Sequence, residues 1–170
     1  MSKSVRILTR CALLTALGVV LNYLSSVLPA ASIAIVAVAG LLTAAAVIHA
    51  GLLYAFAVFF VTAALSLLLT PDKSGALLYT VFLGYYPALK SLLERKVRPA
   101  VPCWIIKLLL FNGIFALIGA LGAGILFPGS GTAAPWIVIQ GVGNIVFVVY
   151  DIGLSRLISF YIRRVSIHVK

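Results

Sequence analysis

Between residues 11 and 89 the sequence carries only two charged side chains, Asp72 and Lys73. A helix needs about 20 apolar residues to cross the hydrocarbon core of a bilayer, so this stretch is long enough for several crossings. The whole chain has the same character, with 64% hydrophobic and 9% charged residues, whereas soluble domains carry roughly 25% charged residues. The sequence therefore predicts an all-α, polytopic membrane protein.

A basic segment at residues 90–98, KSLLERKVR, divides the apolar chain into two halves. Basic residues prefer the cytoplasmic side of a membrane, so this segment constrains how often the preceding chain crosses. The apolar run at residues 30–70 is about 41 residues long, which suits two helices better than one. A single crossing would put the basic segment outside while the N-terminus stayed inside. We therefore expect a hairpin there, with its turn near His49 and Gly51.

Six transmembrane helices with both termini in the cytoplasm place 12 of the 13 Lys and Arg residues at the inner side and leave Lys73 outside. We expect one membrane domain over residues 1–170, in a bacterial inner membrane, with an uncleaved first span. Pro87 should kink the fourth span, and Lys90 and Glu94 should pair where that span continues as an interfacial helix. The basic tail should lie along the membrane surface. The expected spans are residues 7–28, 31–48, 50–69, 74–90, 102–127 and 136–156.

The net charge of +10 does not indicate a nucleic-acid partner, because the basic residues stand at the ends of apolar spans, where topology explains them. The sequence contains no HExxH, GxSxG or P-loop motif, so neither an enzyme nor ATP binding is predicted. Three acidic residues and two histidines are scattered along the chain and predict no metal or cofactor site. Any pumping would need energy from another chain.

Polar residues inside a span are costly and are therefore candidates for function. Gln140, Asn144, Asp151 and Ser155 lie within about 60° of one another on the last span, because successive helical residues are turned by 100°. Gln140 and Asn144 are expected in the outer half of the membrane, and Asn112 of the preceding span is expected to point into the middle of the bundle or at a neighbour. Two interpretations of these carboxamides stay open, which are contact with a small ligand and hydrogen bonding between helices.

Lys107 and Asp151 have matching depths on the antiparallel last two spans, so we expect an ion pair that joins their inner ends. The alternative is that Lys107 alone extends its ammonium group to the interface. The outer side of the carboxamides is expected to be flanked by Tyr79, Trp136 and Lys73. Together with the carboxamides, these residues could form a pocket with an aromatic wall for a small molecule.

The chain begins with a basic N-terminus and TRCALLTALGVVLNYL, in which Ala12 and Ala16 form an AxxxA pattern. With six short spans and both ends inside, it resembles the substrate-binding S components of energy-coupling factor (ECF) vitamin transporters. The resemblance implies that Ala12 and Ala16 dock a transmembrane coupling subunit, which works with ATPase subunits. It also implies a pocket in the outer half of the last three helices, capped by residues 25–32. The residues compatible with that pocket are Tyr79, Asn112, Gln140 and Asn144.

Two functions are therefore expected as alternatives. The first is a substrate-binding subunit of a small-metabolite, vitamin-like uptake transporter, energised by separate partner subunits. The second is a structural or scaffolding membrane protein that resembles the cell-shape protein MreD and has no ligand pocket. A closed, polar-lined outer cavity distinguishes them, because the first function requires it and the second predicts a filled core.

Overall fold

The computed structural model describes residues 3–97, 99–126 and 133–167, and within these ranges the chain is helical and contains no strand. Five helical segments are long and apolar enough to cross a membrane. A further helix, α6 (Ala100–Leu126), contains the apolar segment Val101–Leu117. The all-α architecture with several membrane-spanning helices is thus confirmed, whereas the cytoplasmic placement of both termini stays a prediction.

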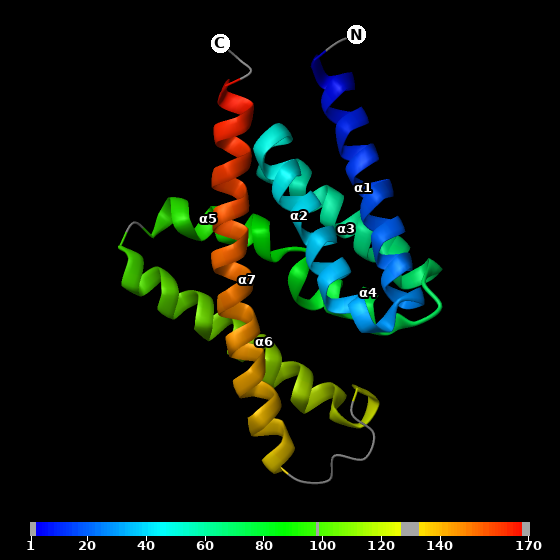
Figure 1. Cartoon of the computed structure of the whole chain (residues 1–170), viewed down its shortest axis with the longest axis vertical. Helices are drawn as coiled ribbons and strands as arrows, with labels where there is room; N and C mark the ends of the chain where they lie inside the picture. Colours follow the sequence, from blue (N-terminus) through cyan, green and yellow to red (C-terminus); the bar gives the residue numbers. More distant parts are fainter. Residues whose placement is uncertain (1–2, 98, 127–132, 168–170) are drawn as a thin grey trace. The chain divides into compact units, whose positions relative to one another are not determined.

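The helices form two compact units, Met1–Lys96 and Val97–Lys170. The second unit consists of α6 and α7 (Ala133–Ile167). The first unit contains the remaining helices, of which the α-helices are labelled in Figure 1. They are α1 (Lys3–Val27), the 3-10 helix η1 (Pro29–Ala31), α2 (Ser32–Ala50), α3 (Leu52–Leu69), α4 (Lys73–Leu78), the π-helix η2 (Tyr79–Leu83) and α5 (Tyr86–Lys96).

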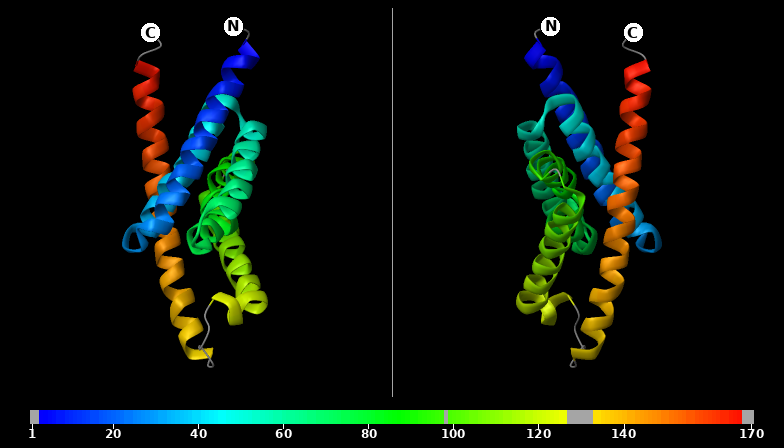
Figure 2. Two further views of the ribbon diagram at one scale, coloured as in Figure 1. Left: turned by 90° about the vertical axis from the view of Figure 1, so that its right-hand side faces the viewer. Right: turned by 90° about the vertical axis from the view of Figure 1, so that its left-hand side faces the viewer.

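A glycine separates α2 from α3 at the position where the hairpin was predicted. Gly51 has φ 94° and ψ 175°, a conformation that is essentially restricted to glycine. Its N–H is donated to the carbonyls of Ala46 and Val47, at 3.2 and 3.1 Å. The turn reverses the chain, so α2 runs opposite to α1 and α3, as both views in Figure 2 show. The sequence-predicted pair of helices in residues 30–70 is therefore confirmed.

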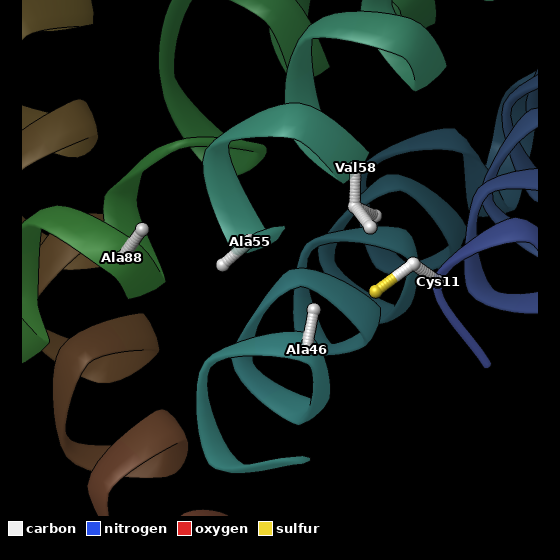
Figure 3. Close-up of a cluster of buried hydrophobic side chains, with 5 residues drawn as sticks. All are labelled: Cys11, Ala46, Ala55, Val58 and Ala88. Carbon is white, nitrogen blue, oxygen red and sulfur yellow. The ribbon is translucent and has the colours of Figure 1, made fainter. Parts of the chain in front are cut away.

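Small side chains fill part of the core of the first unit. Cys11 of α1, Ala46 of α2, Ala55 and Val58 of α3 and Ala88 of α5 are all buried and pack together (Figure 3). Small residues at such contacts let helix backbones approach closely, which is a main source of helix association in membranes. Cys11 is a free thiol here.

The fourth span is interrupted rather than simply kinked. The π-helix η2 ends at Leu83, a turn follows, and α5 then begins at Tyr86. Pro87 lies in the first turn of α5, where a missing N–H leaves no hydrogen bond unmade. The departure from α-helical geometry begins before Pro87, at the π-helix, and the kink predicted at Pro87 stays a prediction. The predicted pair of Lys90 and Glu94 forms on α5, with Nζ and Oε1 3.2 Å apart.

The last helix continues further than expected. α7 has 35 residues and reaches Ile167 without interruption, whereas the sequence predicted a span that ends near residue 156 and a tail along the surface. The segment beyond Ser155 contains neither glycine nor proline, so nothing in it terminates a helix. At 1.5 Å per residue, α7 is about 52 Å long, which exceeds the roughly 30 Å hydrocarbon core.

Asp72 caps the N-terminus of α4. The stability of the first unit should therefore decrease at acid pH. The Ser74 hydroxyl and the Ser74 N–H both donate to its carboxylate, and these bonds lower the pKa of Asp72. A lowered pKa stabilises the fold above the unfolded value of about 3.9, and this contribution is lost as the pH falls through the folded value. When the pH is lowered from 6 to 3, we expect the thermal unfolding midpoint to fall by less in Asp72→Asn than in the wild type. An equal fall in both proteins would assign no such role to Asp72.

Candidate functional site

The candidate site is a column of polar side chains between α6 and α7, and its first layer is a buried ion pair. The Lys107 Nζ lies 3.3 and 3.2 Å from the two carboxylate oxygens of Asp151. Both residues are buried, at 3% and 2% exposure. The Trp104 ring lies 5.4 Å from the same Nζ, which is within cation–π range. The predicted pair between these helices is therefore present.

An aromatic layer follows the ion pair along both helices. The rings of Phe111 and Phe147 are stacked, with centroids 4.8 Å apart and planes 7° apart. Phe115 extends the layer, with its centroid 5.7 Å from that of Phe111. Phe111 and Phe147 are buried. They separate the ion pair from the carboxamides, so the two polar layers are distinct.

The carboxamide layer joins the two helices by hydrogen bonds. Asn112 and Asn144 form a reciprocal pair, in which each Nδ2 donates to the other's Oδ1, at 2.9 and 3.0 Å. Gln140 Nε2 also donates to Asn112 Oδ1, at 2.8 Å. Of the two interpretations left open by the sequence, interhelical hydrogen bonding is therefore realised in the structure. We call Asn112, Gln140 and Asn144 the amide cluster.

The amide cluster keeps hydrogen-bonding capacity at Gln140. Asn112 Nδ2 and Asn144 Nδ2 also donate to their own helices, to the carbonyls of Leu108 and Gln140. By contrast, the Gln140 Oε1 accepts no hydrogen bond from any residue that the structure describes, and the residue is only half-buried. Among the described residues, this oxygen is therefore available to accept a hydrogen bond from a ligand.

The other predicted pocket residues are placed differently. Tyr79 belongs to the first unit, where it is buried and its hydroxyl lies 3.2 Å from that of Thr43. The side chain of Trp136 lies outside the described residues. Ala12 and Ala16 are both exposed on α1, as a docking surface requires.

Further along α7, Ser155, Arg156, Ser159 and Phe160 line a hollow of about 380 Å³ that does not include the amide cluster. The described residues also include no group of three or more His, Cys, Asp or Glu side chains that could hold a metal ion.

Sequence reasoning missed a second polar group, in the first unit. Asn22, Thr62 and Ser66 are buried with no solvent exposure. Asn22 is a carboxamide in the first expected span, whereas Thr62 and Ser66 are hydroxyl residues in the third. Hydroxyls in membrane helices usually bond to their own backbone and are tolerated there, so these two gave no signal.

Comparison with known proteins does not add a relative: no family profile matches the sequence, and neither the curated proteins nor the solved structures contain a similar one. The function must therefore be inferred from the residues of this chain.

Proposed function

We propose that this protein is the substrate-binding subunit of an uptake transporter for a small, vitamin-like metabolite, energised by separate partner subunits. The amide cluster carries the proposal, because three carboxamides meet between two predominantly apolar helices, separate from the Lys107–Asp151 pair. Polar side chains at membrane depth are costly, and those that are kept there commonly mark a substrate path. The Gln140 Oε1, which accepts from none of the described residues, would give the cluster an acceptor for a ligand N–H.

The chemistry of the cluster favours a neutral ligand that both donates and accepts hydrogen bonds. A carboxamide presents a donor and an acceptor side by side, which complements an amide, a lactam or the edge of a nucleobase. Asn112, Gln140 and Asn144 are the proposed contacts to these groups.

Two further parts of the proposal concern partners and orientation. Ala12 and Ala16 are exposed on α1, and small residues allow another helix to approach closely. We assign to them the docking of a transmembrane coupling subunit that works with ATPase subunits. Both termini would lie in the cytoplasm, with the amide cluster in the outer half of the cell membrane.

A thermal-shift screen of vitamins and nucleobases tests the ligand contact. At least one compound should raise the unfolding midpoint of the purified wild type. Gln140→Met, which keeps the size of the side chain but removes its amide, should lose most of that shift. Thr80→Val is the matched control, because the Thr80 hydroxyl donates within its own segment, to Ala76, and its shift should remain. A compound that shifts Gln140→Met as strongly as the wild type would place the ligand elsewhere.

The alternative function is a membrane scaffold that resembles MreD. One observation favours it, namely that the members of the amide cluster already bond to one another, as helix packing alone would require. Exposed small residues on α6, Gly113 and Ala116, would then serve helix–helix contacts with partners. A scaffold should show no shift with any compound in the screen.

A further inference from the structure

The contact between α1 and α3 contains buried polar atoms that have no hydrogen-bond partner among the described residues. These are both polar atoms of the Asn22 carboxamide, Thr62 Oγ1 and Ser66 Oγ. All three residues have no solvent exposure. Buried polar groups in proteins are nearly always hydrogen-bonded, and in a lipid environment no outside water reaches them.

Asn22 of α1 lies at a level similar to that of Thr62 and Ser66 of α3, and the two helices are parallel (Figure 2). Gly18 of α1 faces Thr62 of α3, because a Cβ placed on Gly18 would be 2.9 Å from Thr62 Cγ2 and 3.3 Å from Thr62 Oγ1. One turn further along, Asn22 follows Gly18 and Ser66 follows Thr62. Side chains on a helix lean toward its N-terminus. Asn22 therefore reaches back over Gly18 toward Thr62, and Ser66 leans toward the same point.

Neighbouring hydroxyls bond to backbone carbonyls of their own helix, unlike those of Thr62 and Ser66. The Ser25 hydroxyl donates to the carbonyl of Asn22, and the Thr70 hydroxyl donates to the carbonyl of Ser66, both at 2.7 Å. Such bonds to the own helix are common for Ser and Thr. Thr62 and Ser66 of α3 make no such bond among the described residues. The Thr62 hydroxyl lies beside Gly18 of α1.

We infer that Asn22, Thr62 and Ser66 form a buried hydration site that holds an ordered water molecule between α1 and α3. The occupant must both donate and accept, because the carboxamide offers N–H groups and an oxygen while the hydroxyls can do either. A cation would leave the Asn22 N–H groups unpaired, and an apolar group would satisfy none of the atoms. Buried water typically makes about three hydrogen bonds in such a place. This inference does not depend on the proposed function.

Infrared difference spectroscopy of the full chain in lipid nanodiscs tests the site directly. Exchange of H₂¹⁶O for H₂¹⁸O should shift an O–H stretching band of internal water in the wild type. That band should be absent in the variant Asn22→Leu/Thr62→Val/Ser66→Ala and should remain in the control Thr80→Val. A wild type without an isotope-shifted band, or a variant that keeps it, would overturn the inference.

The single variant Thr62→Val provides a test that does not require the triple variant to fold. If water bridges the three side chains, loss of one hydroxyl removes a hydrogen bond and should lower the thermal midpoint by roughly 2–4 °C. If the site is dry, the same substitution removes an unsatisfied buried hydroxyl at constant shape, so the midpoint should rise. An unchanged or raised midpoint would therefore contradict the hydration site.

Discussion

Lys107→Met should lower the free energy of unfolding by about 3–5 kcal/mol, because it leaves the Asp151 carboxylate buried without its partner. The two charged groups are 3.2 Å apart, and Asp151 is only 2% exposed. Removing one member of a buried pair costs far more than replacing both, since the desolvation of the remaining charge is no longer compensated. Thermal or denaturant unfolding of the purified protein in detergent measures the effect.

The double variant Lys107→Met/Asp151→Asn separates the ion pair from the size of the side chains. It should recover a large part of the loss, because no buried charge then remains. Lys73→Met is the matched control, since Lys73 is an exposed lysine whose Nζ donates only to a backbone carbonyl, that of Thr70. It should change the stability by less than about 0.5 kcal/mol. Equal stability of Lys107→Met and the double variant would show that the two residues are not coupled.

Gly84→Ala should destabilise the protein by about 1–3 kcal/mol, through overpacking of the core. A Cβ at this position would lie 2.7 Å from atoms of both the Phe59 and the Tyr79 rings. Both rings are buried, and the Tyr79 hydroxyl is in contact with Thr43, so neither has free space to move into. Gly84 has φ −73°, which any residue can adopt, so the cost would be steric. The free energy of unfolding measures it.

Gly113→Ala is the control for this substitution. Gly113 lies within α6, and an added Cβ would meet no atom within 4 Å. Alanine in a helix interior is more favourable than glycine by roughly 0.5–1 kcal/mol, so Gly113→Ala should be neutral or stabilising. Similar losses for Gly84→Ala and Gly113→Ala would contradict the assigned packing around Gly84.

The helices could largely be predicted from charge and length. The basic segment at residues 90–98 required a hairpin in residues 30–70, and Gly51 supplies its turn. Two features were not predictable in the same way. The π-helix before Pro87 has no signal in the charge or hydropathy pattern, and Gly84 at its end packs closely against Phe59 of another helix. The length of α7 was underestimated because hydropathy marks where a span leaves the membrane, not where its helix ends.

The candidate site could be predicted only in part, for a physical reason. Lys107 and Asp151 are oppositely charged and lie at matching depths of antiparallel helices, so little else could pair with either. Carboxamides are less selective, because each can bond to a ligand or to another carboxamide. The sequence thus located the amide cluster but left its partners open. Thr62 and Ser66 were missed, since a hydroxyl in a span is usually satisfied by its own helix.

Native mass spectrometry of the gently purified protein tests the proposed substrate-binding role most directly. The wild type should carry a co-purified small molecule, and Asn144→Leu should lose it while remaining folded, because Asn144 holds the amide cluster together. A wild type that carries no small molecule after extraction in mild detergent would contradict a ligand site at the amide cluster. A bound molecule that Asn144→Leu retains would contradict it as well. The carboxamides would then serve only to join α6 to α7.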